Sequence, residues 1–313
     1  MKTYLIPIAA VLILFSCELV IDVETPDFDP SIVANSIIQP DSSFRVYLSR
    51  DYYILDNQID NYEKQGLTGA TIRLFENDQL LGTMNEIVIE TQWGETFNGY
   101  YVFDYQPKAG QTYRMEVEKS GYETVIAEQQ IPQGLPDVTV AITDTTESEW
   151  GSELYKVEMD LKDLPGDNYY EVQLYISTWE PNYDYEKDST WYRQVIYELY
   201  AYPESILVSE YQERFLFSDE LFKDTDYTIT FEIENYFNYY YDDGISEPPG
   251  DSYIFYQVRN CTEAYYNYYN SAALYSWNDG NPFAEPVHVY TNIENGFGIF
   301  GSFTSRTDTL LVY

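Results

Sequence analysis

The sequence is poor in cysteine, histidine and basic residues. It has two cysteines and one histidine, and 16 Lys and Arg stand against 53 Asp and Glu, for a formal net charge of -37. Proteins bind nucleic acids by neutralising phosphates with basic groups, so this composition argues against a nucleic-acid partner. One histidine and two cysteines also leave no zinc-ligand cluster. The acidity favours solubility through charge repulsion, with attraction of cations as the alternative interpretation.

The motifs of common catalytic sites are also missing. There is no Gly-x-Ser-x-Gly turn, no phosphate-binding glycine loop and no pair of histidines for metal-assisted hydrolysis. With so many acidic residues, some carboxylates lie close together by chance, so spacing predicts no glycosidase pair. We therefore predict that the protein is not an enzyme and has no catalytic residue, metal or dissociable cofactor. An extracellular hydrolase with paired carboxylates is the remaining alternative.

Aromatic side chains, by contrast, are abundant. The 35 Tyr and 16 Phe supply far more buryable surface than a disordered chain carries, despite the net charge. Tyrosine together with valine and threonine favours β-strands. We therefore expect a folded, mainly β protein, and roughly 300 residues are ample for two domains.

The N-terminus has the pattern of a secretory signal peptide. Lys2 is followed by an apolar run over residues 5–15, which is shorter than the about 20 residues that a membrane-spanning helix needs. Leu14 stands three residues before Cys17, and the small Ser16 stands directly before it, as a lipoprotein signal peptidase requires. We predict a signal peptide over residues 1–16 and a diacylglycerol and N-acyl group on Cys17. A plain signal peptide and an uncleaved anchor are the alternatives.

Residues 17–30 are predicted to form a lipidated, acidic tether. Residues 18–24 contain no Lys or Arg, so they have no electrostatic attraction to an anionic leaflet. This stretch resembles the acidic tags that send Bacteroidota lipoproteins to the outer face of the outer membrane. If Cys17 carries lipid, Cys261 has no disulfide partner within the chain, and we predict a buried, inert thiol.

Two prolines and a glycine within residues 131–136 predict a domain boundary. We predict an immunoglobulin-like β-sandwich over residues 31–132 and a second β-rich domain, sandwich or barrel-like, over residues 137–313. Period-two apolar alternation predicts strands on both sides of this boundary. The alternating segments are 44–48, 70–75, 113–117, 155–161, 170–176, 227–233 and 254–258.

The second domain is predicted to carry an insertion and one helix. Residues 177–226, rich in Tyr, Asp and Glu, form the insertion, with one strand near residues 193–199. The helix is expected over residues 262–277, because Thr262 suits an N-cap and Glu263 the positive end of the helix dipole.

Two aromatic and acidic segments, 179–185 and 236–244, contain the candidate binding residues. Aromatic faces on loops stack on sugars or anchor protein partners, whereas packing within the domain is the alternative. Asp242 and Asp243 beside Gly244 suit calcium in residue type only, since the ligand spacing of known calcium loops is absent. The candidate ligand- or partner-binding residues are Trp179, Tyr183, Tyr185, Tyr239, Tyr240 and Tyr241.

The C-terminal part contains a distinctive block. Residues 281–286 read Asn-Pro-Phe-Ala-Glu-Pro, and residues 291–301 read Thr-Asn-Ile-Glu-Asn-Gly-Phe-Gly-Ile-Phe-Gly. Asn295-Gly296 predicts a hairpin turn before a closing strand, and His288 is predicted to be an ordinary strand side chain. We interpret the block as architectural, closing the core.

These residues carry a family resemblance that covers nearly the whole chain. The C-terminal block, the lipid-attachment motif and the tyrosine-rich helix after Arg259-Asn260-Cys261 resemble a Bacteroidota lipoprotein family, the domain of unknown function DUF4249. The resemblance implies an N-terminal immunoglobulin-like domain, a C-terminal β-rich domain and genes beside TonB-dependent outer-membrane transporters. That family has no established catalytic residues to carry over.

The expected function follows from the anchor and from this resemblance. We expect a lipid-anchored protein of the outer membrane, facing the cell surface, that captures a ligand for a TonB-dependent transporter or docks on it. A structural, adhesive or outer-membrane assembly role is the alternative.

Overall fold

The computed structural model describes residues 29–40, 42–52, 66–91, 94–148, 151, 153–184, 189–203, 208, 214–234, 250–279, 281 and 283–312. The described residues form three β-sheets and one helix, which confirms the mainly β class. All of these strands and the helix lie in one compact unit, Pro30–Asp51 with Asn61–Tyr313. The predicted signal peptide, Cys17 and most of the tether lie outside the described residues. No helix among those described is long and apolar enough to cross a membrane.

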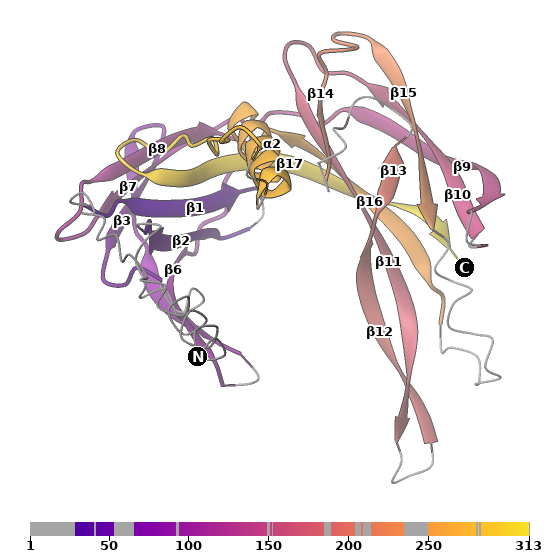
Figure 1. Cartoon of the computed structure of the whole chain (residues 1–313), viewed down its shortest axis with the longest axis horizontal. Coiled ribbons are helices and arrows are strands. Elements are labelled where there is room, and N and C mark those ends of the chain that lie inside the picture. Colours follow the sequence, from indigo (N-terminus) through magenta and orange to yellow (C-terminus); the bar gives the residue numbers. More distant parts are fainter. Residues whose placement is uncertain are drawn as a thin grey trace, which may run out of the picture. The chain divides into compact units, whose positions relative to one another are not determined.

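The largest sheet has nine strands in the order β12-β11-β16-β17-β1-β2-β6-β5, with β14 also paired to β11 (Figure 1). Each sheet is open, so the strands described do not form the barrel that was the alternative for the second domain. The strands of the large sheet are β1 (Ile32–Ile38), β2 (Phe44–Arg50), β5 (Asn85–Glu90), β6 (Thr96–Phe103), β11 (Tyr169–Asp184), β12 (Ser189–Leu199), β14 (Phe215–Ser218), β16 (Tyr253–Cys261) and β17 (Phe297–Val312).

Two four-stranded sheets complete the fold. One has the order β4-β3-β7-β8 and the other β13-β15-β10-β9. The first consists of β3 (Thr71–Glu76), β4 (Gln79–Thr83), β7 (Thr112–Glu118) and β8 (Val125–Gln130). The second consists of β9 (Asp137–Glu147), β10 (Glu153–Lys162), β13 (Ala201–Pro203) and β15 (Asp226–Glu234).

Two hydrophobic cores lie between these sheets and the large one. The first joins residues of β1, β2 and β6 to residues of β3, β7 and β8, such as Leu48, Ile72 and Tyr113. The second joins β11 and β16 to β10 and β15 in the same way. Each fully buried apolar side chain contributes about 2 kcal/mol by leaving water. The alternation in the sequence therefore becomes two β-sandwich cores.

Strand β17 serves both halves of the large sheet. Residues 297–302 pair in parallel with β1, and residues 303–312 pair antiparallel with β16. The close approach to β1 requires a glycine at position 298, where φ is +103° and a Cβ would lie 2.1 Å from the Ala34 carbonyl oxygen. The C-terminal strand thus completes a sheet that begins with the first strand of the fold.

The helix α2 (Glu263–Asn278) confirms the sequence prediction. The Thr262 hydroxyl accepts a hydrogen bond from the Tyr265 backbone N–H, and Glu263 lies in the first turn. Only Ala264 and Tyr265 are buried, so the helix attaches to the sheet by its N-terminal turn.

The insertion at 177–226 contains more strand than the sequence predicted. Strand β11 continues through to Asp184, and β12 begins at Ser189 rather than near residue 193. The side chains of β12 are mostly exposed, so its sequence lacks the buried alternation that marks a strand in a core.

The prediction that His288 lies in a strand was wrong. Residues 285–293 form no strand, and the Tyr290 backbone N–H donates to the Ser271 hydroxyl of α2 at 2.8 Å. Valine and histidine alternate here in a segment without strand structure, which is bonded to the helix through Tyr290. The His288 side chain is exposed.

The predicted boundary at residues 131–136 is free of strand and separates β8 from β9. Because β17 belongs to both halves of the large sheet, the segment 31–132 does not contain every strand of the first sandwich. The division into 31–132 and 137–313, and the immunoglobulin-like character of the first sandwich, stay predictions.

Candidate functional site

The hairpin of β11 and β12 extends beyond the strand that supports it (Figure 1). Strand β11 pairs with β16 only as far as Ser177, so residues 178–184 and 189–195 form a two-stranded arm. Tyr183 and Trp191 on this arm are 48% and 52% exposed. Isolated two-stranded hairpins have marginal stability, so an arm bearing aromatic side chains suits contact with a partner.

The predicted binding residues on this arm differ in their surroundings. Trp179 is half-buried: its indole N–H donates to the Asp251 carbonyl at 3.3 Å, and its ring lies against Gly250. Tyr183 lies on the same face of β11, since it is four positions further along the strand. The structure therefore places Trp179 in a packing role and Tyr183 at the surface. Tyr185, Tyr239, Tyr240 and Tyr241 lie outside the described residues, as do Asp242 and Asp243.

A buried polar cluster lies beneath the start of α2. Glu171, which is fully buried in β11, has both carboxylate oxygens engaged. Its Oε1 accepts from Arg214 Nη1 at 2.8 Å, and its Oε2 accepts from Arg259 Nη1 and the Tyr265 hydroxyl, each at 2.7 Å. We call Glu171, Arg214, Arg259 and Tyr265 the Glu171 cluster.

Burial and the Glu171 charge raise the pKa of two groups in or beside the Glu171 cluster. Burial, together with the Glu171 charge, raises the pKa of Tyr265. Burial also raises the pKa of the Cys261 thiol well above its ordinary value, and the side chain is 3% exposed. A thiol that stays protonated is a poor nucleophile, so Cys261 is buried as predicted and packs against Tyr265 and Phe303.

A groove lies on the outer face of the large sheet, beside α2. We call it the α2 groove. Its volume is about 740 Å³, within the usual range of small-molecule sites. Its floor is formed by outward-facing residues of β1, β2, β5 and β6 with Ile299 of β17, and Tyr268 and Tyr269 form the helical wall. The outward-facing floor residues are Asn35, Ile37, Arg45, Tyr47, Ile87, Ile89, Tyr100, Val102 and Ile299.

The polar groups of the α2 groove are few. None of its lining residues is Asp or Glu, although the chain has 53 of them. Arg45 is exposed, and within the described part of the chain no carboxylate pairs with its guanidinium. The Asn35 Oδ1 atom is buried without a hydrogen-bond partner. The groove therefore presents apolar and aromatic surface and one cation.

The Glu171 cluster and the α2 groove meet at Tyr269. The Arg214 Cζ atom lies 4.1 Å from the centre of the Tyr269 ring, which also lies 4.6 Å from the Tyr265 ring. A cation over an aromatic face is held electrostatically. The cluster thereby positions one wall of the groove.

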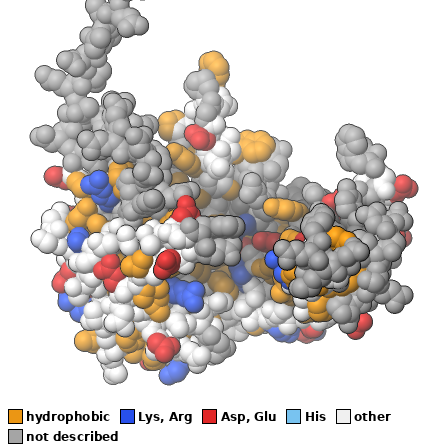
Figure 2. Space-filling model, turned by 90° about the horizontal axis from the view of Figure 1, so that it is seen from below, with side chains coloured by type: hydrophobic (Ala, Val, Ile, Leu, Met, Phe, Trp, Pro, Cys, Tyr) orange, Lys and Arg blue, Asp and Glu red, His pale blue; other side chains and the backbone are white. Residues whose placement is uncertain are grey.

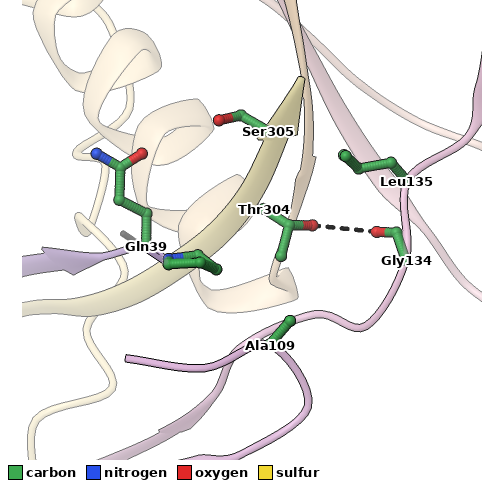
Figure 3. A pocket seen from close by; sticks show the side chains of 7 residues that line it. Gln39, Ala109, Gly134, Leu135, Thr304 and Ser305 are labelled. Atoms are coloured by element: carbon green, nitrogen blue, oxygen red, sulfur yellow. Dashed lines mark hydrogen bonds between the residues drawn. The ribbon is translucent and has the colours of Figure 1, made fainter. Parts of the chain in front are cut away.

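A second hollow of about 490 Å³ lies beside the segment that links β8 to β9. In Figure 3 the Thr304 hydroxyl points toward Gly134 and donates to its carbonyl oxygen at 3.1 Å. Asn260 Nδ2 donates to the same oxygen at 3.2 Å. These bonds anchor the linker to β16 and β17, and this hollow has an architectural explanation.

The other exposed apolar side chains are dispersed. On the face shown in Figure 2, they stand among acidic and basic side chains. Phe283, which is 94% exposed, is the extreme case among the described residues. Single exposed apolar residues are normal on protein surfaces and indicate no site by themselves.

The C-terminal block closes the first core. The Asn292 side-chain amide exchanges two hydrogen bonds with the Phe300 backbone, at 2.8 and 2.9 Å. Ile293 is buried in the core, and Glu294 pairs with Ile126 of β8. Asn295 adopts a positive φ of 60° in the turn before β17. These contacts support the architectural interpretation of the block.

The chain matches the family described as Domain of unknown function (DUF4249) over residues 18–309. The chain belongs to this family. No curated protein matches it. A crystal structure described as a membrane anchored protein from Corynebacterium diphtheriae is 11% identical and covers 75% of this DUF4249 chain, with a TM-score of 0.20. The chain spans 55% of that protein, and a TM-score this low carries no argument.

Sequence reasoning on this DUF4249 chain missed both the Glu171 cluster and the α2 groove. Glu171 alternates with Tyr170 and Val172, so it reads as an outward, solvated position of a strand. The groove takes residues from five strands and a helix that are far apart in the sequence. The one available signal was the run Ile87-Val88-Ile89, which puts apolar residues on both faces of a short strand.

Proposed function

We propose that this chain is a non-enzymatic lipoprotein of the outer membrane, facing the cell surface. It acts as an accessory to a TonB-dependent transporter, capturing a ligand for the transporter or docking on it. The observation that carries the proposal is the two-stranded arm of β11 and β12, which presents Tyr183 and Trp191 to solvent. Large, rigid aromatic side chains are the usual anchors of protein interfaces.

The anchor in this proposal rests on the N-terminal sequence. Ser16-Cys17 follows an apolar run of signal-peptide length, and residues 18–24 lack basic groups that would hold them on an anionic leaflet. A multiply acylated cysteine gives lasting attachment, whereas a single chain does not. The Cys17→Ser chain is therefore expected in the soluble fraction after cell lysis, and the wild-type chain in the outer membrane.

Co-purification from outer membranes tests the docking partner. A tagged wild-type chain is expected to recover a transporter barrel, identified by mass spectrometry. The double variant Tyr183→Ser, Trp191→Ser is expected to recover about tenfold less, because it removes both aromatic anchors. Leu80→Ser is the matched control, since Leu80 is 58% exposed on β4, away from the arm.

Recovery of the wild-type chain without any transporter barrel would contradict the proposed partnership. If adhesive or assembly components co-purify instead, the structural role is the better account. Equal recovery by the arm variant and the Leu80→Ser control would show that docking uses another surface.

A further inference from the structure

The edge strand β5 gives the α2 groove an exposed apolar side. All six residues of β5 are exposed, and Ile87 and Ile89 are 38% and 39% exposed. Both line the groove, whereas Val88 between them faces away and is 59% exposed. Charged side chains usually protect edge strands, and in β5 Glu86 and Glu90 flank the apolar run. The run itself, Ile87 to Ile89, has no charge, and an apolar body over Ile87 and Ile89 explains its exposure.

Arg45 gives the groove a cation in a strongly acidic protein. Basic residues are scarce, and other arginines of the described chain make ion pairs with carboxylates, as Arg73, Arg114, Arg193, Arg214 and Arg259 do. Arg45 makes none among the described residues. With no Asp or Glu in the lining, an anion in the groove meets one positive charge and no negative one among the lining residues.

We propose that the α2 groove binds a small amphiphilic acid. The ligand has an apolar or aromatic body, which packs between Ile87, Ile89 and the tyrosines of α2. It carries one anionic group for Arg45. This site lies outside the arm of β11 and β12, and it does not depend on the proposed transporter partnership.

Two fluorescent probes with the same rings test this chemistry. Anilinonaphthalene sulfonate has an aromatic body, an N–H donor and one negative charge, and phenylnaphthylamine is its neutral counterpart. Fluorescence titration of the full chain measures the affinity for each. Every variant keeps the same N-terminus, so any binding there is common to all of them.

The Arg45→Gln variant separates charge from apolar contact. It is expected to bind the sulfonate about fivefold more weakly and the neutral probe unchanged, as for an exposed ion pair. Added salt should reproduce this loss in the wild-type chain. Lys162→Gln is the control, because it removes the same charge from β10, outside the groove.

Variants of β5 test the location of the apolar body. The double variant Ile87→Thr, Ile89→Thr is expected to bind both probes about tenfold more weakly, because apolar contact is lost and strand propensity is kept. Val88→Thr is the matched control on the opposite face of the same strand and should leave both affinities unchanged.

Two sets of results overturn the proposal. The first is equal probe affinity in the β5 double variant and the Val88→Thr control, or equal affinity in Arg45→Gln and Lys162→Gln. The second is a dimer by sedimentation that the β5 double variant dissociates while probe binding rises, because the occupant is then a second copy of the chain. The co-purification result has no bearing on either outcome.

Discussion

Buried polar atoms differ in their hydrogen bonding on the two sides of α2. Beneath the helix, both oxygens of Glu171 are bonded, to two arginines and a tyrosine. Beside the helix, Asn35 Oδ1 is buried with no partner, and Arg45 makes no ion pair among the described residues. Tyr269 belongs to both regions, since the Arg214 guanidinium lies over its ring and the residue lines the groove.

This contrast separates architecture from a candidate site. A buried carboxylate stabilises a fold only when its partners satisfy it, and breaking such a cluster is more costly than never having formed it. An unsatisfied buried acceptor lowers stability wherever it lies. The groove is distinguished instead by its apolar lining and by the Arg45 guanidinium, which makes no ion pair among the described residues. We therefore interpret the Glu171 cluster as the support of α2 and the α2 groove as the site.

The largest effect is expected from breaking the Glu171 cluster. Glu171→Gln leaves the two arginines without their counter-charge, so the free energy of unfolding should fall by about 3 kcal/mol. Guanidinium denaturation measures this change. Glu158→Gln, on the exposed face of β10, is the control and should alter stability by less than about 0.5 kcal/mol. Equal stability of the two variants would show that the cluster does not support the fold.

A smaller effect is expected from the hydroxyl in the Glu171 cluster. Tyr265→Phe removes the 2.7 Å bond to Glu171 Oε2 and should lower the free energy of unfolding by about 1.5 kcal/mol. Tyr266→Phe is the matched control, because its half-buried ring lies tilted against Tyr169, with the centroids 4.9 Å apart, and its hydroxyl makes no hydrogen bond among the described residues. If both variants lose the same stability, the loss comes from the helix in general.

The smallest effect, of opposite sign, is expected in the α2 groove. Asn35→Leu keeps nearly the same shape and removes the unsatisfied acceptor, so the free energy of unfolding should rise by about 1 kcal/mol. Thermal denaturation measures this change. A fall in stability would assign Asn35 a structural role.

Local signals in the sequence predicted much of the fold. Thr262 and Glu263 marked the start of α2, and the alternation around Ile229 and Val258 marked β15 and β16. These features depend on neighbouring residues alone, so they can be predicted from short stretches of the sequence.

The features that position the candidate site depend on distant residues. Strand β17 pairs with both β1 and β16. This pairing depends on the register between strands that are distant in the sequence, and no local sequence pattern predicts it. Glu171 and Asn35 both occupy ordinary outward positions in their strands, and only the docking of α2 makes one of them buried and the other a groove residue. The arm of β11 and β12 escaped prediction because few of its side chains are buried, so its sequence lacks the apolar alternation of a core strand.

A crystal structure of the chain with anilinonaphthalene sulfonate tests the central claim most directly. The account predicts the naphthyl rings against Ile87, Ile89 and Tyr269 and the sulfonate at the Arg45 guanidinium. A probe bound elsewhere on the protein, with the α2 groove empty, would contradict it.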